Sequence, residues 1–141
     1  MKICITSLGP NLDSPIDPRF GRARYFLLLD ENGELKKVLP NSGVNAIRGA
    51  GIAASQQIVQ QGVEVLITGN IGPNAFGALM ASKIRVFLGL PGVSSSVREI
   101  FNMWKENKLS QVQAPSVPGH FGKGPSFGRR GWGQGGWRGQ R

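Results

Sequence analysis

Residues 63–76, VEVLITGNIGPNAF, join a continuous apolar run to a turn rich in glycine and asparagine. The run Val63–Thr68 has the length and composition of a strand that is buried on both faces. The turn Gly69–Asn74 contains Pro73, and proline is favoured in the first turn of a helix. A buried strand that leads through a short turn into a helix is the repeating unit of α/β proteins, so this stretch predicts a parallel sheet covered by helices.

The strand-and-helix pattern continues on both sides of this stretch. Before it, residues 51–61 place apolar side chains on one helical face and are followed by Gly62, a residue typical of helix C-termini. After it, we expect a helix over residues 75–82, a strand over residues 84–88 and a last helix that begins with a capping box over Ser96–Glu99. The apolar residues of this last helix have helical spacing: Val97, Ile100, Phe101 and Trp104.

Three further strands are predicted at the start of the chain, over residues 2–7, 25–29 and 35–39. Asn32-Gly33 separates the last two, and this pair accepts the positive φ angles of a tight hairpin turn. Hairpin strands are antiparallel, whereas strands joined through helices must be parallel. The sequence therefore predicts one α/β domain over residues 1–113, with a mixed five-stranded sheet and helices on both faces.

The positive charge of the chain is unevenly distributed. The formal net charge is +9, yet residues 1–113 carry 12 Lys and Arg against 8 Asp and Glu. Residues 114–141 contain 5 Lys and Arg, no acid and 9 glycines, and they show no hydrophobic periodicity. Such a segment cannot bury enough apolar area to offset its chain entropy, so we expect residues 114–141 to be a disordered tail.

Composition also excludes several classes of protein. No apolar run of 18 residues is present, so no membrane span is predicted, and the first residues lack the apolar core of a signal peptide. We therefore expect a cytoplasmic protein without a membrane partner. The single cysteine, Cys4, excludes an intramolecular disulfide and an all-cysteine metal site built by one chain.

The turn Gly69–Asn74 is a candidate binding site for an anion. It opens a helix, where unpaired backbone N–H groups and the helix dipole favour negative charge. Gly69 and Gly72 would let a ligand approach the backbone closely, and Asn70 and Asn74 belong to the same turn. The alternative is an ordinary strand-to-helix turn, in which glycine and asparagine are common.

The stretch Arg19-Phe20-Gly21-Arg22-Ala23-Arg24 is the second candidate. Guanidinium groups pair well with oxyanions, so three arginines within six residues can cradle a polyanion. The alternative is a solvated basic edge. If the first strand pairs with the strand that ends at Thr68, Arg19–Arg22 and Gly69–Asn74 both lie at the edge of the sheet where α/β proteins bind ligands.

Both segments resemble motifs of the dinitrogenase iron–molybdenum cofactor biosynthesis family, which includes NifX-like proteins and the C-terminal domain of NifB. Residues 19–26 match [H/R]-F-G-R-A-x-x-F, and residues 63–76, which contain ITGNIGPNA over 67–75, are similar to the segment G-V-x-x-x-I-T-G-x-x-G-x-N-A. The resemblance covers residues 1–113 and implies a three-layer α/β/α fold of ribonuclease-H-like type, with strand order 3-2-1-4-5 and strand two antiparallel.

The same resemblance implies a function. It indicates an accessory protein that binds or carries an iron–molybdenum–sulfur or other molybdenum–sulfur cluster, or a thiometallate precursor. A client metalloprotein or a cluster-assembly protein would be its partner. The residues that match the motifs, and so would hold the cargo, are Arg19, Phe20, Gly21, Arg22, Gly69, Asn70, Gly72 and Asn74.

One position departs from the family pattern, because members often have histidine where this chain has Arg19. Imidazole can ligate iron or molybdenum, whereas guanidinium stays protonated and cannot. Outer-sphere holding of an anionic cluster is therefore the mechanism that this sequence favours. Cys4 and His120 are the candidate metal ligands, although a cysteine within a strand is usually a small buried hydrophobe and His120 lies in the expected tail.

The sequence predicts no enzyme. A nuclease of ribonuclease-H type needs clustered carboxylates that begin on the first strand, and residues 2–7 contain no acid. The glycine-rich stretch over residues 49–54 has the spacing of a dinucleotide fingerprint, but no strand precedes it.

The tail supports a second hypothesis, in which the protein binds single-stranded nucleic acid. Aromatic residues stack on bases and arginines contact phosphates, and both alternate among the glycines of residues 114–141. The alternative is a solubilising extension.

If the tail binds RNA, a chain that ends at Gln113 should lose RNA affinity and keep its thermal midpoint. Equal RNA affinity with and without the tail would contradict this hypothesis.

Overall fold

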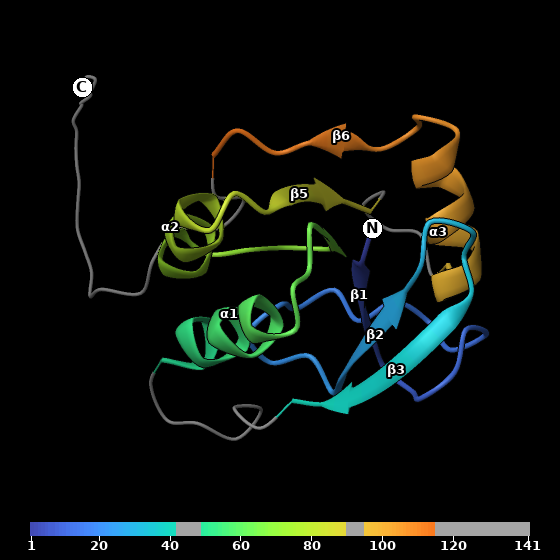
Figure 1. Ribbon diagram of the computed structural model, residues 1–141, viewed down its shortest axis with the longest axis horizontal. Helices are drawn as coiled ribbons and strands as arrows, with labels where there is room; N and C mark the ends of the chain where they lie inside the picture. The colour runs from blue at the N-terminus through green and yellow to red at the C-terminus, as the bar shows by residue number, and fades with distance from the viewer. Residues whose placement is uncertain (42–48, 90–94, 115–141) are drawn as a thin grey trace.

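The structure is a computed structural model of the 141-residue chain and describes residues 1–41, 49–89 and 95–114. Its strands and helices alternate after an initial hairpin, as the sequence predicts (Figure 1). In chain order they are β1 Ile3–Ser7, β2 Tyr25–Leu29, β3 Leu35–Pro40, α1 Ala50–Gln60, β4 Val65–Thr68, α2 Pro73–Ala81, β5 Arg85–Leu88, α3 Val97–Lys105 and β6 Ser110–Gln111.

The strands form a single mixed sheet with the order β3-β2-β1-β4-β5-β6. β1 pairs in parallel with β4, and β4 with β5, whereas β2 is antiparallel to both of its neighbours. The predicted order 3-2-1-4-5 with an antiparallel second strand is confirmed. The predicted count of five strands is wrong by one, because β6 adds a short antiparallel strand beside β5.

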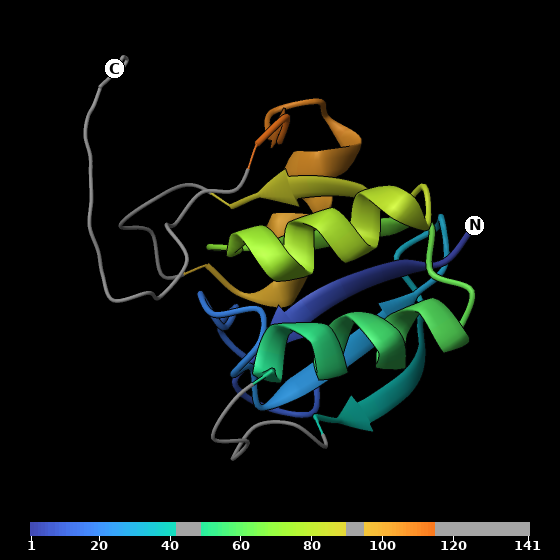
Figure 2. The same cartoon turned by 90° about the vertical axis from the view of Figure 1, so that its left-hand side faces the viewer.

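Helices cover both faces of the sheet, which gives three layers. α1 and α2 lie side by side on one face, and α3 lies on the other (Figures 1 and 2). The side chains of β1 alternate accordingly: Cys4 belongs to the core under α1 and α2, whereas Ile3 and Ile5 belong to the core under α3. The predicted α/β/α architecture is confirmed.

Local signals explain where the helices begin and end. The Ser96 hydroxyl accepts a hydrogen bond from the Glu99 amide at 3.2 Å, and the Glu99 carboxylate accepts one from the Ser96 amide at 3.0 Å, so the predicted capping box is confirmed. Gly62 follows α1 with a φ of 75°, a left-handed conformation that glycine adopts without strain. α2 begins earlier than predicted, because Pro73 takes the first helical position.

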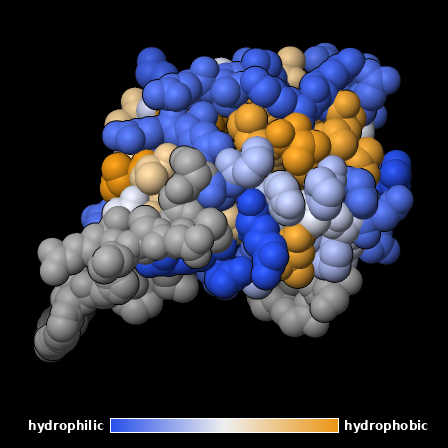
Figure 3. All heavy atoms as spheres, turned by 90° about the horizontal axis from the view of Figure 1, so that it is seen from below, coloured by the Kyte–Doolittle hydropathy of each residue, from blue (hydrophilic) through white to orange (hydrophobic). Residues whose placement is uncertain are grey.

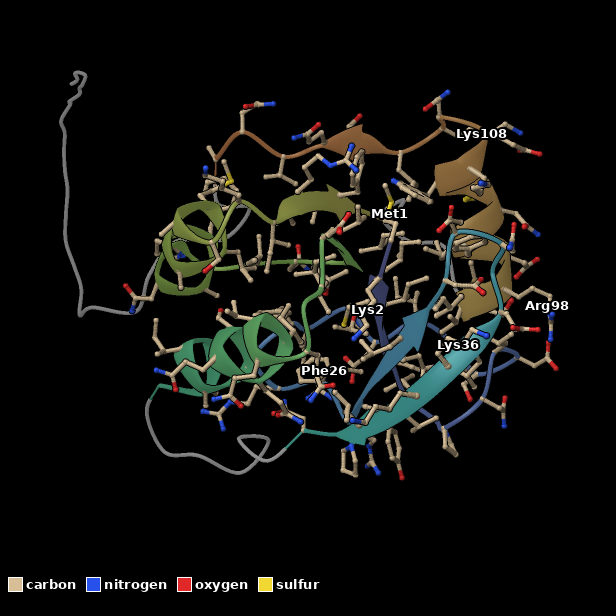
Figure 4. All side chains as sticks on the ribbon, viewed as in Figure 1. Met1, Lys2, Phe26, Lys36, Arg98 and Lys108 are labelled. Carbon is tan, nitrogen blue, oxygen red and sulfur yellow. The ribbon has the colours of Figure 1, made fainter. Side chains whose placement is uncertain are left out.

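β3 forms one edge of the sheet. Its outer positions include the exposed Lys36 and Lys37, and charged side chains of this kind discourage pairing with another strand. On the side of the molecule where β3 lies, hydrophobic patches are interspersed with hydrophilic ones (Figure 3). Lys36, which is labelled in Figure 4, lies near the start of β3. Among the described residues, no helix is both long enough and apolar enough to span a lipid bilayer.

Candidate functional site

The two candidate loops meet where the central strands β1 and β4 end, and the word edge refers to this end of the sheet in the description of the site. β1 and β4 are parallel neighbours, so Ser7 and Thr68 end their strands at the same edge. Beyond these ends, Arg19 forms an isolated parallel backbone bridge with Asn70. Gly69 lies so close to the first loop that a Cβ atom added to it would be 2.6 Å from the Pro18 Cα atom. The two loops are therefore in direct contact.

The arginine-rich loop is fixed by hydrogen bonds on two sides. The carboxylate of Asp17 accepts bonds from the backbone amides of Arg19, at 3.0 Å, and Arg24, at 3.1 Å. The side-chain amide of Asn41 donates to the carbonyl oxygens of Gly21 and Ala23, both at 2.9 Å. Both anchoring side chains are buried, so the loop has one defined shape.

Asp17 and Asn41 were not predicted as site residues. Asp17 is recognisable in retrospect, because an aspartate whose carboxylate accepts the amide two residues later forms a common local turn. Asn41 had no local signal, because its partners lie 18 and 20 residues away in the sequence.

Two of the predicted loop residues serve packing. Phe20 is buried, and its ring centroid lies 5.9 Å from that of Phe26, so its side chain anchors the loop in the core and does not face a ligand. A Cβ atom at Gly21 would lie 2.9 Å from the backbone nitrogen of Gly51. Glycine at this position therefore lets the arginine-rich loop touch the first turn of α1.

The N-termini of α1 and α2 lie next to each other beside this loop. A Cβ atom at Gly51, in the first turn of α1, would lie 3.1 Å from the Ala75 Cβ atom in the first turn of α2. Figure 2 shows the two helices running side by side in the same direction. Their positive dipole ends consequently point toward the edge that carries the two loops.

These two N-termini differ from the N-terminus of α3. No described side chain caps α1 or α2, and neither has an acidic residue in its first turn. In α3, by contrast, the amides of Val97, Arg98 and Glu99 donate to Ser14, Leu12 and Ser96, respectively. Backbone donors at the start of α3 are therefore consumed within the protein, whereas, among the described residues, the starts of α1 and α2 have neither a side-chain cap nor an acidic residue to offset their positive dipole ends.

The arginine-rich loop carries three arginines, and one of them, Arg19, contacts a buried carboxylate. Arg19 is 57% exposed, and its Nε atom lies 3.2 Å from the fully buried Asp17 carboxylate. Arg24 is exposed and Arg22 half-buried, while Asn70 and Asn74 are exposed at the start of α2. Side chains and helix ends thus supply an excess of positive charge and of hydrogen-bond donors at one edge.

Of the two candidate metal ligands, the structure describes only Cys4, and Cys4 does not contribute to this site. Cys4 is completely buried, and desolvation raises the pKa of its thiol far above the ordinary value, so the thiolate is strongly disfavoured. His120 lies outside the described residues. Within residues 1–41, 49–89 and 95–114, no group of three or more His, Cys, Asp and Glu side chains is arranged to hold a metal ion.

We expect Cys4→Ala to lower the free energy of unfolding by about 1 kcal/mol, since it removes one small buried group from the core. Binding of metal–sulfur anions should be unchanged, because the Cys4 side chain packs under α1 and α2. Denaturant unfolding and an anaerobic binding titration measure the two quantities. If a folded Cys4→Ala variant lost binding, Cys4 would be a ligand.

Comparison with known proteins gives one family match and several similar structures. The family described as dinitrogenase iron-molybdenum cofactor matches residues 1–107. The chain is similar to the apo form of the orange protein from Desulfovibrio gigas, with 35% identity and a TM-score of 0.76, over 82% of this chain and 96% of that one. It is also similar to a Thermotoga protein described as a candidate NifB, with 34% identity and a TM-score of 0.67, over 78% of this chain and 91% of that one.

A third relative comes from an archaeon. An uncharacterized protein of Methanocaldococcus jannaschii is 29% identical over 117 residues, which cover 80% of this chain and 97% of that protein. The family match includes the arginine-rich loop, the turn before α2 and all of α3. Because it spans most of the chain, this protein belongs to the dinitrogenase iron–molybdenum cofactor family.

Proposed function

We propose that this protein is a non-enzymatic accessory protein that binds and carries an anionic metal–sulfur species, such as an iron–molybdenum–sulfur cluster or a thiomolybdate precursor. The observation that carries the proposal is the convergence of the arginine-rich loop with the N-termini of α1 and α2. Family membership supports the choice of a molybdenum–sulfur cargo. The similarity to the orange protein and to the candidate NifB agrees with this choice.

The chemistry of the edge indicates how the cargo would be held. Guanidinium groups and backbone amides donate hydrogen bonds to anions, and neither can ligate a metal. Arg19 and Arg22 would contact terminal sulfur or oxygen atoms of the cargo from one loop. Gly69, Asn70, Gly72 and Asn74 would present the start of α2 from the other.

The same chemistry favours a carrier over an enzyme. Asp17 is the carboxylate closest to the guanidinium of Arg19, and its oxygens already accept hydrogen bonds from Arg19 and Arg24. A group held in this way is poorly placed to act as a general base or a metal ligand. Family membership supports a client metalloprotein or a cluster-assembly protein as the partner that receives the cargo.

The nucleic-acid hypothesis stays a prediction. It depends on the tail, and residues 115–141 lie outside the described part of the chain. The family name, by contrast, refers to an iron-molybdenum cofactor.

Anaerobic titration of tetrathiomolybdate into the full chain tests the proposal. We expect saturable binding of one anion per chain, followed by visible absorbance, with an affinity that falls as the salt concentration rises. The same titration with an iron–molybdenum–sulfur cluster covers the larger cargo. If the wild-type chain bound neither species, the proposed function would be wrong.

A further inference from the structure

Asp17 is a buried carboxylate directly beneath the arginine-rich loop. Its side chain is fully buried, yet it contacts a guanidinium group that is 57% exposed. The carboxylate accepts four hydrogen bonds from two residues: the Arg19 amide at 3.0 Å, Arg19 Nε at 3.2 Å, Arg19 Nη2 at 3.4 Å and the Arg24 amide at 3.1 Å. These donors compensate a buried negative charge that would otherwise be costly.

The backbone of Asp17 is attached to the two central strands. Its amide donates to the Thr6 carbonyl oxygen at 3.0 Å, and its carbonyl oxygen accepts from the Thr6 hydroxyl at 2.7 Å. The Thr6 hydroxyl also lies 2.9 Å from that of Thr68. Since each hydroxyl has a single hydrogen, Thr68 donates to Thr6 while Thr6 donates to Asp17. Asp17 is therefore held at the ends of β1 and β4.

The contact with Asp17 uses only part of the Arg19 guanidinium. A guanidinium group has five N–H donors, and Asp17 accepts from Nε and Nη2. No described residue accepts a hydrogen bond from Nη1, so its hydrogens are the donors that we assign to a ligand at the surface. A long side chain that is already held in one orientation loses less conformational freedom when it binds a ligand.

We propose that Asp17 is a positioning residue for the anion site, which holds the Arg19 guanidinium at the ends of β1 and β4 so that its outer donors face the cargo. This inference rests on the proposed function and specifies how that site is pre-organised. The competing possibility is that the negative charge of Asp17 merely opposes the anion. The two possibilities predict opposite effects of removing the Asp17 charge. Loss of a positioning residue would weaken anion binding, whereas loss of an opposing charge would tighten it.

A double-mutant cycle with tetrathiomolybdate separates the two. We expect Asp17→Asn to weaken binding about tenfold when Arg19 is present and by less than about twofold in an Arg19→Ala background. Circular dichroism and the thermal midpoint establish that each variant is folded. Tighter binding by Asp17→Asn, or an equal effect in both backgrounds, would overturn the proposal.

Arg19→Lys provides a test that leaves Asp17 intact, so it also serves if Asp17→Asn fails to fold. Lysine keeps the positive charge but cannot reproduce the paired Nε and Nη2 bonds to the carboxylate. We expect its affinity to resemble that of Arg19→Ala. Wild-type affinity in Arg19→Lys would show that charge alone suffices and that positioning by Asp17 has no role.

Hydrogen exchange at Arg19 Nε needs no ligand, so it tests the positioning role of Asp17 separately from the proposed function. In the NMR spectrum of the free full chain, this hydrogen should exchange slowly with water, and it should exchange much faster in Asp17→Asn. Arg98 is a matched control, because its Nε atom lies 3.1 Å from Asp13 Oδ1, and both of those side chains are exposed. If the wild-type chain bound no tetrathiomolybdate, the proposed function would fail, whereas equal Arg19 exchange in wild type and variant would overturn the role of Asp17.

Discussion

Replacing Arg19 and Arg22 together with alanine is expected to weaken tetrathiomolybdate binding roughly a hundredfold or more. A hydrogen bond to a charged group contributes about 1.5–3 kcal/mol, and each 1.4 kcal/mol corresponds to about tenfold in affinity. Both arginines belong to the loop that Asp17 and Asn41 hold beside the start of α2. The Asp17 carboxylate would keep its bonds from the backbone amides of Arg19 and Arg24, and circular dichroism with the thermal midpoint establishes that the double variant is folded.

The matched control removes the same charge elsewhere. Lys36→Ala combined with Lys37→Ala also lowers the net charge by two. These lysines lie on β3, where Lys37 pairs with Leu28 and Leu28 pairs with Cys4, so they are farther along the sheet from the ends of β1 and β4. Visible absorbance of tetrathiomolybdate would follow binding to both double variants. Equal weakening in the two would indicate a general charge effect and would contradict a site at the arginine-rich loop.

Gly69→Ala is expected to lower both the stability of the domain and its affinity for the anion. The new Cβ atom would lie 2.6 Å from the Pro18 Cα atom and 2.8 Å from the Pro18 carbonyl oxygen. Both are backbone atoms, so the two loops must move apart. Overpacking of this kind costs about 1–3 kcal/mol, and the thermal midpoint of a small domain falls by roughly 4–8 °C for each kcal/mol.

Gly77→Ala is the control for this prediction. Gly77 lies within α2, and a Cβ atom added there would meet nothing within 4 Å. Alanine is the better helix former, so Gly77→Ala should raise the thermal midpoint slightly and leave anion binding unchanged. Thermal unfolding and tetrathiomolybdate titration of both variants provide the comparison. If Gly69→Ala matched Gly77→Ala in both measurements, the close contact between the loops would have no role in stability or binding.

Most of the fold could be predicted because its signals are local. The capping box at Ser96 and Glu99 depends on residues three apart, and the hairpin depends on a turn of adjacent residues. Gly33 has the positive φ that the Asn-Gly pair predicts, with a value of 86°. β6 was missed because Ser110 and Gln111 are exposed and lack any apolar pattern, so only their pairing with β5 defines a strand.

The candidate site was less accessible to prediction, because it depends on contacts between distant segments. The sequence placed the arginines and the turn Gly69–Asn74 near one edge, and the structure shows that Arg19 and Asn70 are paired. The sequence could not show that the N-terminus of α1 lies beside these two loops, because this arrangement depends on the close approach of Gly21 to Gly51. Phe20 was predicted from the sequence as a site residue, although its side chain is buried in the core.

NMR mapping of tetrathiomolybdate on the full chain would locate the anion on the structure. The anion is added under anaerobic conditions to protein labelled with nitrogen-15, and the shift of each assigned backbone amide is followed. We expect the largest shifts on Arg19–Arg22, on Gly69–Ala75 and on Gly51 in the first turn of α1. Saturable shifts centred elsewhere, for example on Lys36 and Lys37 of β3, or no shifts at all, would contradict an anion site at the meeting point of the two loops and the two helices.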